Sequence, residues 1–461
     1  MDFRVEKDSM GEMKVPADKM WGASTQRSIE NFKIGTEKIP DEMVRAFATL
    51  KKACTTVNAK QGLIDETRVR AIIQACEEIE QGKLTGNFPL AVWQTGSGTQ
   101  FNSNVSEVVA FRANQILKEN NETVSVHAND HVNLSQSSND LFPTAMHLVG
   151  IDMITNQLLP AMKALQITLT EKSEEYADIV KVGRTHLMDA IPLTLGQEIS
   201  AWARMLERNI EFIESGVEYL RDIALGGMVL GTGLTTKVGF ADMVADELSL
   251  LTNFKLRPAK NFFHSLTSKD EITVVHGMLR TLAADLMKIA NDIRLLASGP
   301  RCGIGEIAVP VNEPGSVIQP GKVNPTQCEA LTMVAVQIFG NDVTVGFAAS
   351  QGILQLNVYM PVIAYNFIQS IRLLADAIQS FNINCAQGIT PRKDRIEFFL
   401  NQTMMVSTAL VPLLGYDKAT QIIKTAMNEG ITLKEAALAT GWVTEAEYDL
   451  HMDPNGMISP R

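Results

Sequence analysis

Cysteine is scarce in this 461-residue chain, and the few that occur exclude two kinds of architecture. The five cysteines are odd in number, widely scattered and never spaced as Cys-x-x-Cys. Such usage is typical of a reduced, cytoplasmic protein with neither a disulfide framework nor a cysteine-based zinc site. The residues concerned are Cys54, Cys76, Cys302, Cys328 and Cys385.

Positive charge is also in short supply. Lysine and arginine number 41 against 52 aspartates and glutamates, so the formal net charge is −11 at pH 7. That charge disfavours a nucleic acid or an anionic membrane as partner, and an anionic substrate would need a local group of hydrogen-bond donors. No apolar run of about 18 residues and no N-terminal signal segment occurs, so we expect a soluble cytoplasmic protein.

Helical periodicity dominates the middle of the chain. Residues 329–340, EALTMVAVQIFG, are apolar nearly all round, which predicts a helix buried on most sides. Several long helices of this kind predict a mainly α fold with a central helical bundle. The clearest stripe, at i, i+4, i+7, i+11 and i+14, consists of Leu282, Leu286, Ile289, Ile293 and Leu296.

The two ends of the chain have a different character. The N-terminal part is mixed, with a candidate strand near residues 10–16. The C-terminal part predicts short helices that begin with capping boxes at 432–435 and 444–447, and its excess of acids argues against a DNA-binding helix-turn-helix. We therefore predict three domains: a mixed N-terminal domain at 1–137, a central bundle at 138–390 and a small helical C-terminal domain at 391–461.

A long polar connection interrupts the helices at 313–330, EPGSVIQPGKVNPTQCEA. Connections of this length are uncommon in compact domains and are usually functional or disordered. Asn324 is a candidate N-cap, with Pro325 at the first helical position and Glu329 in the first turns. Lys322 then places a positive charge beside exposed N–H donors, which favours an anion site. The alternative is an ordinary capped helix with a surface lysine.

Three other stretches are hydroxyl-rich turns that precede helical patterns. Residues 93–102, WQTGSGTQFN, lack the Gly-Lys-Ser/Thr of a P-loop and precede a helix predicted from about Asn104. Residues 135–145, SQSSNDLFPTA, and 182–198, VGRTHLMDAIPLTLGQE, each precede a further helix. Together these turns supply small donors without metal-ligand spacing, a set that suits a small dicarboxylate better than a nucleotide or a metal ion.

The histidines divide by context. His127 and His131 are four residues apart and would suit a metal on a helix, but the Asn-Asp between them favours a turn and no third ligand is evident. We therefore expect no metal. His186, in a polar cluster before a predicted helix, is the best general acid/base candidate. Structural or surface positions are expected for His147, His264, His276 and His451.

At these motifs the chain resembles the fumarase/aspartase superfamily. GSVIQPGKVNP is similar to its signature loop, and WQTGSGTQ, GRTHL, LMKIAND and NPTQCEALTM are similar to class II fumarate hydratases in particular. The similarity runs from about residue 4 to residue 453. It implies the superfamily fold, no cofactor, and a homotetramer whose active sites each draw on three subunits.

The resemblance also implies a reaction, the reversible anti addition of water to fumarate to give L-malate. Ser316 would be the base, and Lys322 would stabilise both its alkoxide and the doubly charged aci-carboxylate. His186 would protonate the leaving hydroxyl through a bound water, with Glu329 orienting the imidazole. The substrate-binding residues would be Ser97, Thr99, Asn102, Ser137, Ser138, Asn139, Thr185 and Asn324. A second anion site would comprise His127, Asn129 and Asp130.

Some residues beside these motifs depart from the family pattern. Drift at positions behind the substrate-contacting residues, or protein engineering, would explain them. A pocket adapted to a larger or substituted fumarate would explain them as well, because one lost pocket hydrogen bond costs about 1–3 kcal/mol. A related lyase acting on a carbon–nitrogen bond, or a catalytically silent scaffold, are further alternatives. The departures include Met188, Ile191, Val317, Gln319, Ile353, Gln355 and Met360.

Overall fold

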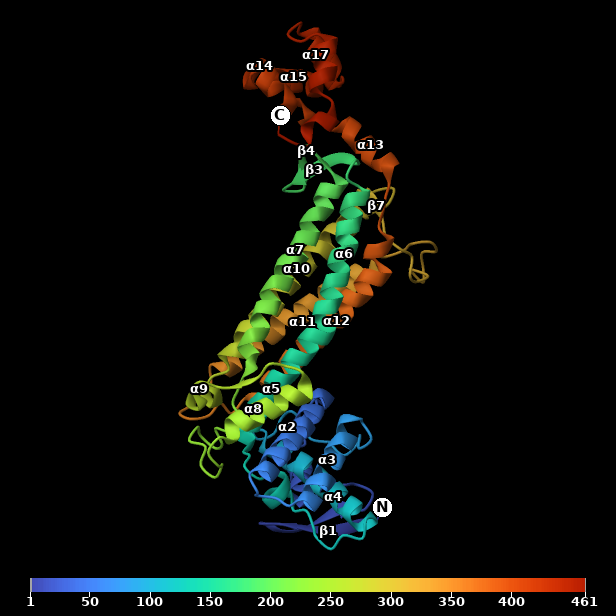
Figure 1. The fold of residues 1–461 in the computed structure, drawn as a ribbon. Coiled ribbons are helices and arrows are strands. Elements are labelled where there is room, and N and C mark those ends of the chain that lie inside the picture. The colour runs from blue at the N-terminus through green and yellow to red at the C-terminus, as the bar shows by residue number, and fades with distance from the viewer. Residues whose placement is uncertain (1, 461) are drawn as a thin grey trace. The chain divides into compact units, whose positions relative to one another are not determined.

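The computed structural model describes residues 2–460, whose contacts divide the chain into two compact units. Each unit is discontinuous in sequence, because the chain passes between them several times (Figure 1). Unit 1 comprises Met1–Pro160, Glu211–Ala283 and Ala335–Ala375. Unit 2 comprises Ala161–Ile210, Ala284–Val334 and Asp376–Arg461. The three-domain division proposed from the sequence stays a prediction.

Unit 1 begins with an antiparallel hairpin, which confirms the strand predicted near residues 10–16. Strands β1 (Phe3–Asp8) and β2 (Gly11–Pro16) pair along their full length. The helices that follow are α1 (Ala23–Asn31), α2 (Asp41–Lys60), α3 (Glu66–Glu80), α4 (Thr99–Glu119), the π-helical turn η1 (Ala128–Val132), α5 (Ser138–Met153) and the π-helical turn η2 (Ile154–Leu158). Farther along the chain come η3 (Glu218–Arg221), α8 (Phe240–Thr252), α9 (Phe262–Thr267) and the short parallel strands β5 (Asp222–Ile223) and β6 (Arg257–Pro258).

Three aromatic rings lie at the centre of the first helices. Phe47 on α2, Phe101 on α4 and Phe142 on α5 are almost fully buried and meet edge to face, with ring centroids 4.8 to 6.3 Å apart. Aromatic pairs in this geometry gain attraction beyond the area they bury. They hold together the starts of α4 and α5, which carry most of the predicted substrate-binding residues.

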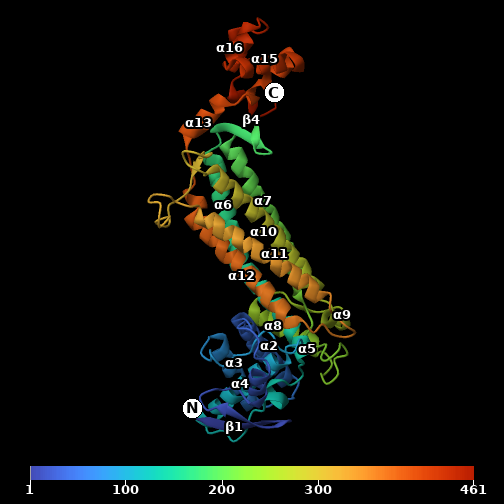
Figure 2. The same cartoon turned by 180° about the vertical axis from the view of Figure 1, so that it is seen from behind.

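Long helices form the predicted bundle (Figures 1 and 2). They are α6 (Leu159–Glu175), α7 (Leu195–Val217), α10 (Asp270–Leu296), α11 (Thr326–Ala349) and α12 (Met360–Asn384). The apolar stripe predicted on α10 is confirmed, since its leucines and isoleucines are 0 to 5% exposed.

The sequence predicted that helix α11 is buried on most sides, with other subunits as a possible cover, and one chain alone does not reach that burial. The helix is not covered on most sides, because a row of large apolar side chains is exposed along it: Met333, Val336, Val343 and Phe347. By length and composition alone it could also cross a membrane, a test that the core helix of a soluble protein passes as well. The sequence could not show the exposure, because periodicity reports how apolar a face is and not what covers it.

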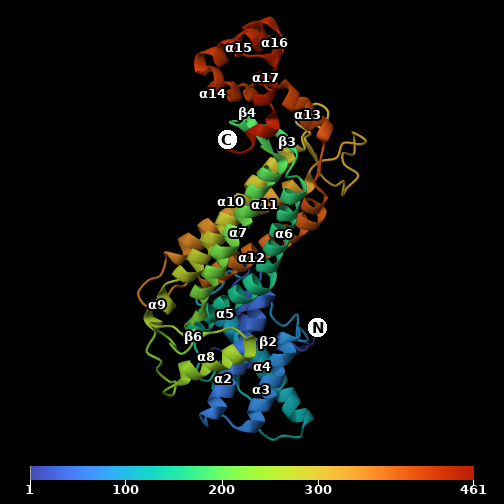
Figure 3. The same cartoon turned by 45° about the horizontal axis from the view of Figure 1, so that its top comes forward.

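The remainder of unit 2 consists of short elements. Hairpin strands β3 (Val180–Thr185) and β4 (Met188–Thr194) precede α7, and β7 (Ile307–Ala308) pairs with β8 (Thr390–Pro391). The C-terminal helices are η4 (Ala386–Gly388), α13 (Lys393–Gln402), η5 (Met405–Leu410), α14 (Val411–Leu414), α15 (Tyr416–Glu429), α16 (Leu433–Ala439), α17 (Glu445–His451) and η6 (Pro454–Met457), most of which Figure 3 labels. Both predicted capping boxes are confirmed, at Thr432 with Glu435 and at Thr444 with Glu447.

Candidate active site

Two of the predicted polar turns lie together in unit 1. The Ser97 and Thr99 hydroxyl oxygens are 2.8 Å apart, and the Thr99 oxygen is 2.8 Å from that of Ser138. This chain of hydroxyls links the start of α4 to the start of α5. Small donors that are separated in the sequence therefore form one cluster, as the dicarboxylate prediction requires.

Glycine makes the approach of these turns possible. Gly98 caps α4 with a φ of 69°, and a Cβ there would lie 2.2 Å from the Phe142 ring. A Cβ on Gly96 would lie 1.4 Å from the Val358 carbonyl oxygen. Helix α4 consequently begins at Thr99, five residues before the predicted start near Asn104, because the left-handed glycine turns the chain directly into the helix.

Asn102 lies one turn into α4 and belongs to a buried polar network. Its Oδ1 accepts from Lys51 Nζ at 2.9 Å, and its Nδ2 donates to Asn133 Oδ1 at 3.0 Å. Asn139 instead donates its side-chain amide to the Val229 carbonyl at 2.7 Å. Both amides are thus oriented by the protein, which is what a preorganised anion site requires.

Sequence reasoning missed Asp140, a fully buried carboxylate in the first turn of α5. Ser137 is the N-cap of α5, and Asp140 completes a capping box by accepting from the Ser137 N–H at 3.0 Å. The other Asp140 oxygen accepts from the N–H groups of Gly226 and Met228, at 3.1 and 2.8 Å. Burial raises the pKa of Asp140 to about 7, although the three N–H donors oppose the rise. The Ser-x-x-Asp pattern at 137–140 was the available signal.

Thr185 and His186 lie in unit 2 at the turn of the β3–β4 hairpin, and both are exposed. His186 and Leu187 have φ values of 56° and 62°. The prediction that His186 belongs to a helix start is wrong, because α7 begins only at Leu195. Left-handed conformations at two consecutive non-glycine residues are strained, and such strain concentrates at functional sites.

The signature loop folds back on itself around Ser316. The Ser316 N–H donates to the Lys322 carbonyl at 3.1 Å. The Ser316 hydroxyl oxygen accepts from the N–H groups of Ile318 and Gln319, at 3.4 and 3.3 Å. Gly315, with a φ of 81°, permits the turn, since a Cβ there would lie 1.9 Å from the Lys322 carbonyl oxygen. Two backbone donors therefore point at the oxygen of the predicted base.

The helix after this loop begins one residue later than predicted. The Glu329 N–H donates to the Pro325 carbonyl at 3.2 Å, so Pro325 and not Asn324 occupies the capping position. Glu329 and Lys322 are exposed, and Asn324 is half-buried. Across residues 2–460, no hydrogen bond or ion pair joins the side chains of His186, Lys322 and Glu329, so the single chain does not bring these candidates together.

The predicted second anion site occupies the π-helical turn η1 in unit 1. His131 Nδ1 accepts from the His127 N–H at 2.8 Å, and His127 Nδ1 lies 3.0 Å from the Asp130 carboxylate. His127 and Asn129 line a cavity of about 1180 Å³ that also receives Arg4. The Nδ1 atoms of both rings bond within the turn, and the histidine pair belongs to no ligand cluster in the part of the chain described.

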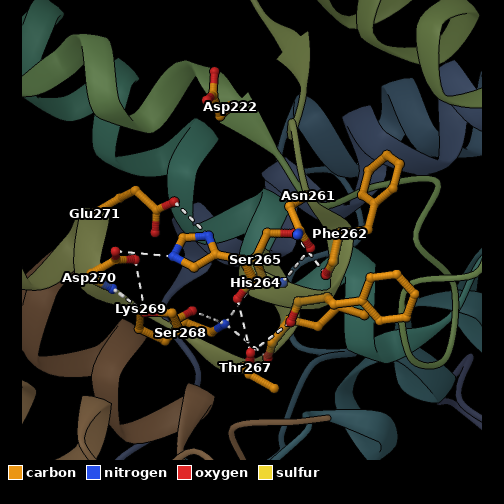
Figure 4. Close-up of polar contacts among 12 residues, drawn as sticks. Asp222, Asn261, Phe262, His264, Ser265, Thr267, Ser268, Lys269, Asp270 and Glu271 are labelled. Atoms are coloured by element: carbon orange, nitrogen blue, oxygen red, sulfur yellow. Dashed lines mark hydrogen bonds and ion pairs between the residues drawn. The ribbon is translucent and has the colours of Figure 1, made fainter.

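A different group in unit 1 has ligand-like spacing. His264 Nε2 lies 3.1 Å from the Asp270 carboxylate, and its Nδ1 lies 4.0 Å from the Glu271 carboxylate (Figure 4). Burial raises the pKa of Glu271 to about 7. His264 and Asp270 are surface residues, as the sequence predicted for His264, and exposed acidic groups of this kind are common without a metal.

Comparison with known proteins places the chain in a family. Residues 11–340 match the family described as lyase, and residues 406–459 match the one described as fumarase C C-terminus. The chain is 56% identical over 461 residues to the class II fumarate hydratase of Bacillus cereus, covering 100% of both chains. The chain belongs to the class II fumarate hydratases.

Further comparisons agree with membership of the class II fumarate hydratases. The chain is 54% identical over 462 residues to the class II fumarate hydratase of Helicobacter pylori, covering all of both. The crystal structure of the class II fumarase from Schistosoma mansoni matches it with a TM-score of 0.96 and 38% identity, covering 99% of each chain. The superfamily fold and the fumarase resemblance read from the sequence are therefore confirmed.

The departures from the class II fumarate hydratase pattern lie mostly on exposed segments. Val317 is fully exposed beside Ser316, and Met188 is 69% exposed near His186. Met360 is the exception, with no exposed surface and its N–H donated to the Gly96 carbonyl at 3.0 Å. The remaining departures, all exposed, are Ile191, Gln319, Ile353 and Gln355.

Proposed function

We propose that the chain catalyses the reversible anti addition of water to fumarate, giving L-malate, in the cytoplasm and without a metal or organic cofactor. The observation that carries the proposal is the turn in which two backbone N–H groups point at the Ser316 oxygen. Full-length identity above 50% to class II fumarate hydratases supports the same conclusion.

Ser316 acts as the base that removes a proton from the carbon next to a carboxylate. A serine is a weak base unless its alkoxide is stabilised, and the Ile318 and Gln319 N–H groups are placed to do this. Lys322 and Asn324 bind the carboxylate on which the second negative charge develops. Their interaction strengthens as the aci-carboxylate forms, which lowers the barrier more than it favours substrate binding.

On the opposite side of the substrate, His186 protonates the leaving hydroxyl through a bound water, and Glu329 orients the imidazole. The carboxylates and that water are bound by the hydroxyls and amides of the polar turns: Ser97, Thr99, Asn102, Ser137, Ser138, Asn139 and Thr185. Closure of the signature loop excludes bulk water. His127, Asn129 and Asp130 form a second anion site.

These residues come together in a homotetramer in which each active site draws on three subunits. The exposed apolar row on α11 supports this assembly, because a face of that size is normally covered in a stable soluble protein. Sharing the site also agrees with the absence, in residues 2–460 of one chain, of hydrogen bonds or ion pairs that join the side chains of His186, Lys322 and Glu329.

The direct test follows the ultraviolet absorbance of the fumarate double bond as purified protein converts L-malate. We expect ammonia-independent turnover that falls by roughly 10²–10⁴-fold in Ser316→Ala, with circular dichroism and tetramer mass unchanged. Negligible turnover of malate by a folded wild-type tetramer would contradict the proposal.

A second candidate is a lyase for substituted fumarates or for amines. It is favoured by apolar side chains beside both catalytic candidates, since Val317 and Ile318 are 100% and 89% exposed, and Met188 follows the hairpin turn. Turnover of 2-methylfumarate or L-aspartate with kcat/KM above that of fumarate or malate would select it. A catalytically silent scaffold would instead show no turnover of any of these compounds.

A further inference from the structure

Lys51 is a fully buried cation in the middle of α2, with 0% of its surface exposed. Its Nζ contacts three side-chain oxygens: Asn102 Oδ1 at 2.9 Å, Asn133 Oδ1 at 3.3 Å and Gln136 Oε1 at 3.4 Å. All three acceptors are neutral amides. Within residues 2–460 no carboxylate lies at ion-pair distance from Lys51.

Burial of a cation without a contacting anion is unfavourable, and it lowers the pKa of Lys51 to about 8. The titratable groups around it are Cys54 on the same helix, Cys76 on α3 and Asp140 on α5. Burial raises the pKa of both thiols, to about 12 for Cys76, so the thiols are neutral. The Asp140 carboxylate bonds only to backbone N–H groups. The charge on Lys51 therefore has no anion in contact.

The amides bonded to Lys51 belong to the segments that carry the hydroxyl cluster. Asn102 follows Thr99 by one turn of α4, and Asn133 and Gln136 lie in the segment that leads to Ser138. Asn102 is oriented at both ends, since its oxygen accepts from Lys51 and its nitrogen donates to Asn133. A substitution of Lys51 would therefore remove one of the two hydrogen bonds that orient Asn102.

We propose that Lys51 is a positioning residue for the dicarboxylate site. It orients Asn102 and supplies a positive charge that is balanced by the carboxylate of the bound substrate. The inference rests on the proposed function, because it assigns Ser97, Thr99 and Ser138 to the substrate. A buried lysine of purely structural importance is the competing explanation.

Lys269 offers a matched control for that explanation. It is also in unit 1, is 2% exposed, and donates to the carbonyls of Ser265, Leu266 and Ser268 at 2.9, 3.2 and 2.6 Å (Figure 4). Burial lowers its pKa to about 8 as well. None of its acceptors belongs to the hydroxyl cluster, so its loss should affect stability but not substrate binding.

The experiment compares Lys51→Met and Lys269→Met with the wild-type tetramer. Both variants should lose thermal stability. Only Lys51→Met should raise the KM for L-malate, by about tenfold or more, because losing one partner of a buried charge interaction weakens binding strongly. Lys51→Arg, which keeps the charge, should recover part of the affinity. Equal KM values in Lys51→Met and the wild type would overturn the proposal.

Calorimetric binding of succinate, a non-reacting C4 dicarboxylate, separates this inference from the proposed function. If malate is not turned over, the proposed function fails, but the affinities of wild type and Lys51→Met for succinate still decide the role of Lys51. The affinity of the wild type for succinate should also fall above pH 8, as Lys51 loses its proton. This measurement does not depend on whether any variant folds. An affinity that stays constant from pH 7 to pH 9.5 would overturn the proposal.

Discussion

At the scale of single residues, burial changes the proton affinity of two side chains in opposite directions. His147 is 5% exposed, and its Nδ1 lies 2.9 Å from the Asp222 carbonyl. Burial, helped by the nearby Lys269 charge, lowers the pKa of His147 to about 4. Burial raises that of Asp140 to about 7. Each shift makes stability depend on pH, with opposite sign.

For His147 the unfolded chain binds the proton more tightly, so stability should be lost as pH falls through the window from about 6.5 to about 4. Between pH 7.5 and pH 5 this loss should be about 2 kcal/mol. Urea unfolding of wild type and His147→Gln at the two pH values, at one protein concentration, measures it. The variant should lose about that much less than the wild type; equal losses would refute the shift.

For Asp140 the folded chain binds the proton more tightly than the unfolded chain. The contribution of Asp140 to folding stability is therefore fully present below about pH 4 and is lost as pH rises toward 7. The pH-dependent contributions of His147 and Asp140 to stability partly cancel in the wild type. For that reason the comparison with His147→Gln, and not the wild-type profile alone, is informative.

At the scale of elements, the start of α4 is determined by a glycine for which no other residue can substitute. Gly98 and Gly62 have nearly the same left-handed φ, 69° and 70°. A Cβ on Gly98 would overlap the Phe142 ring, whereas a Cβ on Gly62 would meet nothing within 4 Å. The pair separates the cost of the backbone conformation from the cost of the overlap.

Gly62→Ala should lower the free energy of unfolding by about 1–2 kcal/mol through its backbone conformation alone. Gly98→Ala should lose about 1–3 kcal/mol more, because the ring must move. Displacement of Thr99 should then also raise the KM for malate. Urea unfolding and steady-state kinetics check both, and similar stability losses in the two variants would contradict the packing role of Gly98.

At the scale of the whole molecule, the exposed row on α11 is the feature that one chain leaves unexplained. Its residues are three, seven and four positions apart, so they lie on one face of the helix. Val343 is 71% exposed on that face, and Leu450, on the C-terminal helix α17, is 72% exposed. Val343 and Leu450 are therefore almost equally exposed, but only Val343 is predicted to lie at a subunit interface. Substitutions of the two residues form a controlled comparison.

Under the proposed assembly, Val343→Asp should convert the homotetramer to dimers or monomers. It should also remove most activity, because a buried unpaired charge is costly at an interface and the proposed active site draws on several subunits. Leu450→Asp should leave both mass and turnover unchanged. Multi-angle light scattering with parallel assays measures these outcomes. A tetrameric, active Val343→Asp protein would exclude this face of α11 from the assembly.

Local signals in the sequence were sufficient for many of the elements. The stripe on α10, the capping boxes of α16 and α17 and strand β2 were all predicted, because periodicity and caps depend on residues a few positions apart. The hairpin at His186 was not, since left-handed residues other than glycine leave no compositional trace. The start of α11 was misplaced by one residue, because Asn324 is a preferred N-cap and Pro325 a preferred first helical residue, whereas the helix begins at Thr326.

Residue types along the chain were therefore enough to identify the helical class, the signature loop and the small donors suited to a dicarboxylate. Only the tertiary structure decided which of these donors share one cluster. Lys51 illustrates the difference, because the amides that surround it are 51 to 85 residues away in sequence. A charged residue in an amphipathic helix resembles any surface lysine until packing removes its water, and packing depends on contacts that no local pattern encodes.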